Sequence, residues 1–244
     1  MILLSAKNLS KTYMERRVLD DVSFFLNEGD KVGIIGVNGT GKSTLLRILA
    51  GAEEADSGEV IRTSGVRISY LPQIPEFEAH GSVLEQVMLH LPEDLKEAKV
   101  FEAKSILGKL GISDVTREIG TLSGGERRRA GIAAALIQPS DILLLDEPTS
   151  SLDIHNQYQV LQITRDLCRE QDLTAMIVIH DLNLALRFCD RFLLLREGEV
   201  YRYGGAEIFD ADALRDVYGV KGSIVQVQGQ SLVLIEDEEK EKLS

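Results

Sequence analysis

The chain has 244 residues, 44% of them hydrophobic, which is enough for one substantial core and a small second lobe. Its 27 basic and 39 acidic side chains give a net charge of −12, which argues against a dedicated nucleic-acid binder. No apolar run is long enough to span a membrane, and residues 1–7 do not read as a secretory signal. Cys168 and Cys189 lack metal-ligand spacing, so we expect reduced thiols in a cytosolic protein.

The sequence of the first half of the chain predicts strands, one helix and then a mainly helical region. Residues 76–118 hold two amphipathic helical patterns and few strand signals, which indicates an inserted helical subdomain. In chain order we expect strands within 1–35 that end in the apolar run Lys31–Ile35, a helix over 43–50 stopped by Gly51, an extended stretch over 59–71, and helices over 83–91 and 95–110.

The second half alternates helices with short strands that are apolar throughout. Strands of this kind are typical of a mostly parallel sheet covered on both faces. Residues 222–244 predict one or two strands and then an acidic tail, whose run 236–242 we expect to be a solvated end. The expected helices are 126–136, 156–170 and 182–189, and the expected strands are Ile142–Leu145, 175–179 and 192–195.

A glycine loop over 36–44 lies between the strand Lys31–Ile35 and a helix, and it has the P-loop spacing. Glycines let successive backbone N–H groups converge on phosphate oxygens, and the helix adds its positive end. Lys42 is expected to reach the β- and γ-phosphates, and the Ser43 hydroxyl can ligate Mg²⁺. The predicted nucleotide-binding residues are Gly36, Asn38, Gly39, Thr40, Gly41, Lys42, Ser43 and Thr44.

Polar side chains follow two of the apolar strands, at the edge where open parallel sheets bind ligands. Asp146 and Glu147 come directly after Ile142–Leu145, and we assign Asp146 to Mg²⁺ and Glu147 to the attacking water. His180 follows the next strand, where a neutral imidazole can bond the γ-phosphate or the water. Glu147, His180 and Lys42 form the predicted catalytic set.

A second glycine loop, 122–126 (Leu-Ser-Gly-Gly-Glu), also precedes a helix but has no lysine. With the P-loop, Gln73, Asp146-Glu147-Pro148, Ser151-Leu152-Asp153 and His180, it completes an ordered set of motifs. This set resembles that of the ATP-binding cassette (ABC) ATPases, over nearly the whole chain. This resemblance implies the P-loop NTPase fold of the ABC type: one α/β domain over 1–244 with a mostly parallel sheet, an antiparallel β subdomain and a small inserted helical subdomain over 76–118.

The resemblance also implies a mechanism and a set of partners. Two identical cassettes pair head to tail around two ATP molecules with Mg²⁺, and Ser123 and Gly125 of one chain complete the γ-phosphate site of the other. Tyr13 stacks on adenine beside Val18, although ordinary packing of its ring is the alternative. The metal site then combines Ser43, Asp146 and Gln73, and Asp153 lies in the loop that couples the two ATP sites.

The two halves of the chain resemble different branches of the family. Residues 1–150 are closest to ABC-F proteins, which act on ribosomes, while the later residues resemble ATPase subunits of importers for iron chelates, haem or cobalamin. A single cassette without a linker favours an importer subunit, bound to a membrane permease at the inner face of the cell membrane. The alternatives are an engineered or recombined cassette and a soluble ABC-F-like ATPase, the one case in which we expect nucleic acid. Glu126 departs from the usual glutamine, Ile179 stands where a small hydroxyl residue is usual, and the helical lobe is short.

Overall fold

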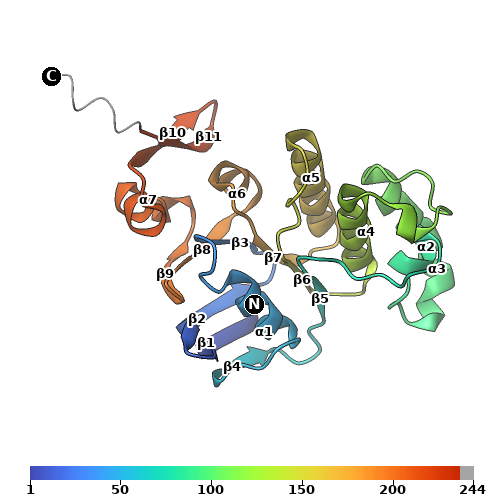
Figure 1. The fold of residues 1–244 in the computed structure, drawn as a ribbon, viewed down its shortest axis with the longest axis horizontal. Coiled ribbons are helices and arrows are strands. Elements are labelled where there is room, and N and C mark those ends of the chain that lie inside the picture. Colours follow the sequence, from blue (N-terminus) through green and yellow to red (C-terminus); the bar gives the residue numbers. More distant parts are fainter. Residues whose placement is uncertain (237–244) are drawn as a thin grey trace. The chain divides into compact units, whose positions relative to one another are not determined.

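A computed structural model describes residues 1–236 of the chain. The chain forms two compact units, and their helices and strands are labelled in Figure 1. The first unit contains Met1–Thr63 and the described residues from Met176 onward, and the second is Ser64–Ala175. The second unit includes the predicted helical lobe 76–118 and extends beyond it on both sides. Among the described residues, no helix is long and apolar enough to cross a membrane.

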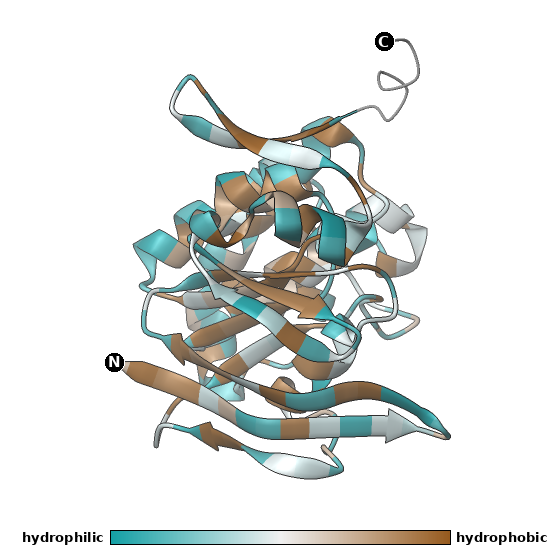
Figure 2. Ribbon diagram, turned by 90° about the vertical axis from the view of Figure 1, so that its left-hand side faces the viewer, coloured by the Kyte–Doolittle hydropathy of each residue, from teal (hydrophilic) through white to brown (hydrophobic). Residues whose placement is uncertain are grey.

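The first unit contains an antiparallel sheet of three strands, in the order β2-β1-β4. Its strands are β1 (Ile2–Tyr13), β2 (Arg16–Asn27) and β4 (Ser57–Arg62). The strand that begins at the N-terminus is hydrophobic at its start and mixed further along (Figure 2). In β2, buried and exposed residues alternate: Val22, Phe24 and Leu26 are buried, and Ser23 and Phe25 between them are exposed. This alternation puts one face of the sheet on the core, and the sheet forms the predicted antiparallel subdomain.

The parallel part of the first unit pairs β3 (Lys31–Ile35) with β8 (Arg191–Arg196), and β9 (Glu199–Gly204) runs antiparallel to β8. The central residues of β3 and β8 are buried, as expected for strands covered on both faces. The remaining elements of this unit are α1 (Lys42–Ala50), α6 (Leu182–Phe188), the short η2 (Ala206–Ile208), α7 (Ala211–Tyr218) and the hairpin of β10 (Gly222–Val227) and β11 (Gln230–Ile235).

The second unit pairs β5 (Ile68–Leu71) in parallel with β6 (Ile142–Leu145), and all four residues of β6 are buried. Strand β7 (Thr174–Val178) carries the chain from this unit back into the first. The helices of the second unit are α2 (Val83–Val87), α3 (Glu93–Lys109), α4 (Gly124–Ile137) and α5 (Ile154–Glu170), with the short η1 (Ile119–Thr121) before α4.

Several element boundaries differ from the sequence-based expectations. The extended stretch 59–71 is two strands, because the chain turns at Gly65, where φ is +84°, before β5 begins. The helix expected over 83–91 ends at Val87. Strand β9 and helix α7 were not predicted. Cys168 and Cys189 are buried and form no disulfide within the described part of the chain, and the acidic tail beyond residue 236 lies outside the described residues.

Candidate active site

The glycine loop 36–44 joins β3 to α1 in the first unit. Glycine is required on its path because neighbouring atoms leave no room for a side chain. A Cβ at Gly36, where φ is +157°, would lie 2.4 Å from the Leu195 carbonyl oxygen. A Cβ at Gly41, where φ is +93°, would lie 2.6 Å from the Val18 carbonyl oxygen. The loop therefore keeps a conformation that presents bare backbone, as a phosphate cradle requires.

Lys42 places a buried positive charge inside this loop, with only 5% of the residue exposed. Its Nζ donates hydrogen bonds of 2.8 Å to the carbonyl oxygens of Gly36 and Val37. The Thr40 hydroxyl also donates to the Val37 carbonyl oxygen, at 2.9 Å. Burying an ammonium costs free energy unless anions or dipoles surround it, so this loop is suited to the oxygens of a phosphate chain. Asn38 and Gly39 are exposed, while Thr40 and Thr44 are buried.

Tyr13 stands at the end of β1 with 39% of the residue exposed, so it is not a core side chain. Its hydroxyl donates to the Glu53 carboxylate and accepts a 3.2 Å hydrogen bond from Nη2 of Arg47, which lies on α1. Arg47 also donates from Nε to Glu53, at 2.9 Å. Burial alone would raise the pKa of Glu53, but the bonds from Tyr13 and Arg47 hold it below its ordinary value. Sequence reasoning proposed Tyr13 for the adenine site but did not predict this support from Glu53 and Arg47.

Two further predicted residues border the P-loop in the first unit. Val18 lies against the loop, since its Cγ1 would be 3.2 Å from a Cβ at Gly41. The backbone N–H of Ile179 donates to the Ile34 carbonyl oxygen at 3.3 Å. The exposed His180 therefore follows at the end of the sheet where β3 leads into Gly36. The first unit thus holds the predicted phosphate, adenine and histidine positions.

The predicted carboxylates lie together at the end of β6 in the second unit. Asp146 is 1% exposed, and its N–H donates to the Leu71 carbonyl oxygen at 2.9 Å. Gln73 donates from Nε2 to Oε2 of Glu147 at 3.0 Å. Hydroxyl, carboxylate and amide oxygens are the donors that Mg²⁺ prefers, so Ser43, Asp146 and Gln73 have suitable chemistry for that ion.

The second glycine loop (122–126, the signature loop) begins helix α4. Ser123 is the N-cap and forms a reciprocal capping box with Glu126. Arg117 donates to both carboxylate oxygens of Glu126, at 2.9 and 3.0 Å. Arg117 first, and then Ser123, lower the pKa of Glu126 to about 2. The glutamate that departs from the usual glutamine therefore has a structural role: it fixes the start of α4.

Asp153 lies next to the signature loop in the same unit. It caps α5 by accepting a 2.9 Å hydrogen bond from the Asn156 N–H, and this bond is the main reason its pKa is lowered. The preceding Leu152 packs against Gly125, since a Cβ there would lie 3.3 Å from Leu152 Cδ2. The second unit therefore holds the signature loop and the loop 151–153 side by side.

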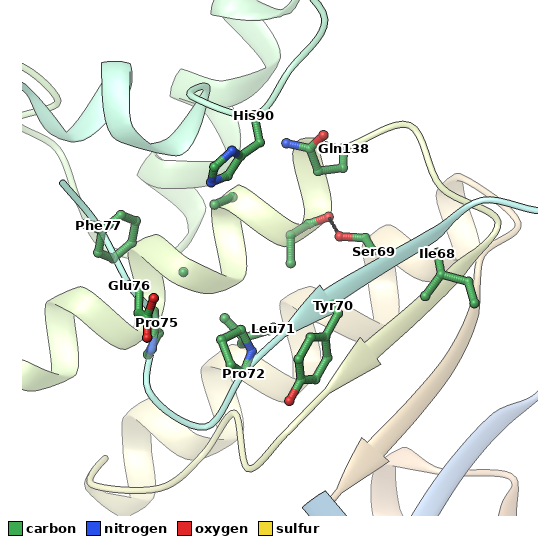
Figure 3. Close-up of a pocket in the computed structure, with 13 residues that line it drawn as sticks. Ile68, Ser69, Tyr70, Leu71, Pro72, Pro75, Glu76, Phe77, His90 and Gln138 are labelled. Carbon is green, nitrogen blue, oxygen red and sulfur yellow. Dashed lines mark hydrogen bonds between the residues drawn. The ribbon is translucent and has the colours of Figure 1, made fainter. Parts of the chain in front are cut away.

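A cavity of about 350 Å³ lies in the second unit between β5, helix α4 and the segment that follows Gln73. Figure 3 shows His90 and Gln138 at one end of it and Tyr70 and Pro72 at the other. Its lining comprises Ile68, Ser69, Tyr70, Leu71, Pro72, Pro75, Glu76, Phe77, His90, Gly131, Ala134, Ala135 and Gln138. The segment that carries Gln73 thus forms one wall of a cavity beside the helical lobe.

Comparisons with known proteins decide the family. The profile described as ABC transporter matches residues 19–150, more than half of the chain. An uncharacterised ABC transporter ATP-binding protein of Methanocaldococcus jannaschii is 33% identical over 96% of this chain and 98% of its own length. The chain belongs to the ABC transporter family. The hemin import ATP-binding protein HmuV of Thermobifida fusca is 36% identical over 92% of this chain and 84% of its own length. The phosphonates import ATP-binding protein PhnC of Caulobacter vibrioides is 32% identical over 89% of this chain and 93% of its own length.

Solved structures extend the likeness to the whole fold. An ABC transporter of the metal-chelate type, in an inward-facing conformation, superposes with a TM-score of 0.82 and 27% identity, over 98% of this chain and 99% of that one. A dimeric ATP-binding cassette bound to ADP and Pi gives a TM-score of 0.73 and 28% identity, over 83% of this chain and 98% of that one. These relatives confirm the predicted ABC-type α/β fold. This ABC cassette is an ATPase that uses ATP with Mg²⁺, and it is an ATP-binding subunit of a transporter.

Proposed function

We propose that this cassette drives an importer for iron chelates, haem or cobalamin and that it works as a head-to-tail homodimer. The observation that carries the proposal is the likeness to the metal-chelate transporter, because it extends over 98% of this chain, whereas the likeness to the dimeric cassette with ADP and Pi extends over 83%. The identity to the hemin import protein points the same way. A phosphonates import protein is similar at 32% identity, so transport assays must decide the substrate.

The chemistry assigned to this chain is hydrolysis of the terminal phosphate of ATP. Lys42 binds the β- and γ-phosphate oxygens, and Ser43, Asp146 and Gln73 hold Mg²⁺. The ion, when bound, neutralises the phosphate charge. Glu147 orients a water and accepts its proton as the water oxygen bonds to the γ-phosphorus and the bond to the ADP oxygen breaks. His180 donates a hydrogen bond to the γ-phosphate.

The signature loop is assigned to the ATP of the partner chain. Ser123 and Gly125 lie at the start of α4, where unsatisfied N–H groups and the positive end of the helix favour a phosphate. Tyr13 stacks on the adenine of the chain's own ATP beside Val18, and Asp153 couples the two sites. Support for the pairing comes from the similar cassette that is dimeric with ADP and Pi.

The permease is proposed to dock on the helical lobe 76–118 and the cavity beside it. An occupant of that cavity would touch Pro72 and Pro75, which flank Gln73, and Gln73 bonds Glu147. Docking would therefore reach the catalytic carboxylate through one short segment. A cassette that works in this way is a peripheral protein at the inner face of the membrane.

The other interpretations predict different partners. An ABC-F-like ATPase would sediment with ribosomes when locked with ATP, and a recombined cassette would bind ATP without a permease or a ribosome. The importer interpretation is supported by a natural relative that aligns over 96% of this chain and 98% of its own length, so both halves have counterparts in one protein. Co-purification with the permease encoded nearby tests it, and sedimentation with ribosomes instead would contradict it.

Replacement of Glu147 by glutamine tests the catalytic assignment. The variant should bind ATP but not hydrolyse it, because the amide cannot accept the proton of the water. It should then accumulate as an ATP-bound dimer in light scattering. Lys42→Ala is the contrasting variant, which should lose nucleotide affinity. A Glu147→Gln protein that stays monomeric with ATP would rule out the head-to-tail dimer.

A further inference from the structure

One arginine of helix α4, which begins in the signature loop, is buried, in contrast to the arginines on either side of it. Arg128 of α4 is 8% exposed, whereas Arg127 and Arg129 are only partly buried. Burial lowers the pKa of Arg128, and the carboxylates of Glu147 and Asp146 attract its charge and oppose that shift. Long cationic side chains normally keep their charged end in water, so this position needs a specific explanation.

The contacts of Arg128 lead to the backbone of Glu147. Its Nη2 donates a 2.7 Å hydrogen bond to the hydroxyl of Ser150. That hydroxyl donates to the carbonyl oxygen of Glu147 at 3.0 Å, and the Ser150 N–H donates to the same oxygen at 3.1 Å. The Nη1 atom of Arg128 is buried and has no hydrogen-bond partner among the described residues. Arg128 therefore closes the turn 147–150 from the side of α4.

The turn needs such a support because Glu147 has an unusual backbone conformation. Its φ is +50°, in the left-handed region that residues with side chains seldom adopt. The next residue is Pro148, which further restricts the backbone of the residue before it. A residue in such a conformation keeps it only when surrounding contacts hold it there. The two hydrogen bonds to its carbonyl oxygen are contacts of this kind.

We propose that Arg128 is a positioning residue for ATP hydrolysis, because through Ser150 it holds the turn that orients the Glu147 carboxylate. The proposal rests on the assignment of Glu147 as the residue that activates water. It adds a connection within one chain, since Arg128 lies on helix α4, two residues after the signature loop. A displacement of that loop by the partner's ATP therefore reaches Glu147 through two hydrogen bonds.

Arg128→Gln tests the proposal in the full-length protein. Because a shift of about 1 Å in a catalytic group can cost about a hundredfold in rate, we expect kcat to fall at least about tenfold. KM for ATP should change less than about twofold, since the P-loop is untouched. Arg128→Lys should recover part of the rate, because its ammonium can still donate to Ser150. The matched control is Arg127→Gln, which should keep the wild-type rate.

Ser150→Ala provides a second arm that leaves the buried arginine in place. It should also lower kcat, and the double variant with Arg128→Gln should be no slower than the slower single variant, because both break one connection. The proposal would be overturned if the fold-loss of kcat in the double variant equals the product of the two single losses. A wild-type kcat for Ser150→Ala would also overturn it. All rates are compared at a temperature where each variant is folded by circular dichroism. If Arg128→Gln does not fold, Ser150→Ala and Arg128→Lys decide alone.

Glu147→Gln separates this proposal from the function on which it rests. If Glu147→Gln hydrolyses ATP at the wild-type rate, the assignment of Glu147 fails, and this proposal fails with it. If Glu147→Gln is inactive and Arg128→Gln is normal, only the role of Arg128 is wrong. The double variant Glu147→Gln with Arg128→Gln should still form the ATP-bound dimer, because its signature loop keeps Ser123 and Gly125. Loss of that dimer would mean that Arg128 supports the fold of the loop and does not act through Glu147.

Discussion

At the scale of single residues, the hydroxyl of Tyr13 offers a test of how the proposed adenine site is held. Tyr13→Phe keeps the ring but removes its bonds to Glu53 and Arg47. We expect ATP affinity to fall about three- to tenfold, the effect of losing about 1 kcal/mol of hydrogen bonding. Inorganic tripolyphosphate has no base to stack, so its affinity should be unchanged. Isothermal titration calorimetry measures both ligands.

Tyr201→Phe is the matched control for this experiment. Its hydroxyl donates to the Asp216 carboxylate at 2.9 Å, in the same unit but at the C-terminal helix α7. Removing this bond should change neither affinity. If Tyr13→Phe lowers the affinities for ATP and tripolyphosphate equally, the P-loop is damaged. If it lowers neither affinity, the hydroxyl does not position the ring.

Sequence patterns identified the residues that we propose to contact the nucleotide, but not those that hold them in place. Lys42 and Asp146 follow short apolar strands at fixed spacing, so local sequence is sufficient to predict them. Glu53 is 40 residues from Tyr13, and Ser150 is 22 residues from Arg128. Such pairs meet only after the chain has folded, and their residue types are common on any surface.

At the scale of elements, the capping box of α4 makes stability depend on pH. The pKa of Glu126 falls from 4.5 to about 2 on folding, so its contribution is complete above about pH 4.5 and is lost as the pH falls toward 2. The full shift corresponds to about 3 kcal/mol, which solvent screening at this partly exposed pair reduces to about 1–2 kcal/mol. Glu126→Gln should destabilise the protein by that amount in urea at pH 7, and the difference should shrink at pH 3.

The control for this measurement is another acidic residue in the second unit. Glu93 pairs with Lys96 three residues later on α3, and its side chain is 87% exposed. Glu93→Gln should therefore change stability little at either pH. A Glu126→Gln difference that is as large at pH 3 as at pH 7 would contradict the ionic origin of the effect and point to the capping geometry alone.

Elements with a strong local signal were predicted, and elements fixed by their neighbours were missed. Strand β6 is a run of four buried apolar residues, and α4 follows a serine with a glutamate three positions later. Strand β9 mixes charged, aromatic and apolar residues, so its sequence gives no strand pattern. It is a strand because its backbone pairs antiparallel with β8. Helix α7 has a cap at Asp210 and a left-handed stop at Gly219, but its eight residues give too short a pattern.

At the scale of the whole molecule, the central question is whether each ATP is shared between two chains. Lys42→Ala disables the P-loop. Gly124→Asp is a suitable lesion for the signature loop, because no atom lies within 4 Å of a Cβ at Gly124. A carboxylate in the first turn also favours helix α4, while its charge repels a phosphate. Each variant alone should be folded and inactive in ATP hydrolysis.

Mixing the two inactive proteins distinguishes a shared site from a site within one chain. In a mixed dimer, one site combines both lesions, and the other combines an intact P-loop with an intact signature loop. With random pairing, half of the dimers are mixed and half of their sites are intact, so about a quarter of the wild-type activity should return if the sites act independently. A site made within one chain would stay inactive in every combination. The control mixture pairs Lys42→Ala with a chain that carries both changes, and it must remain inactive because no intact site can form.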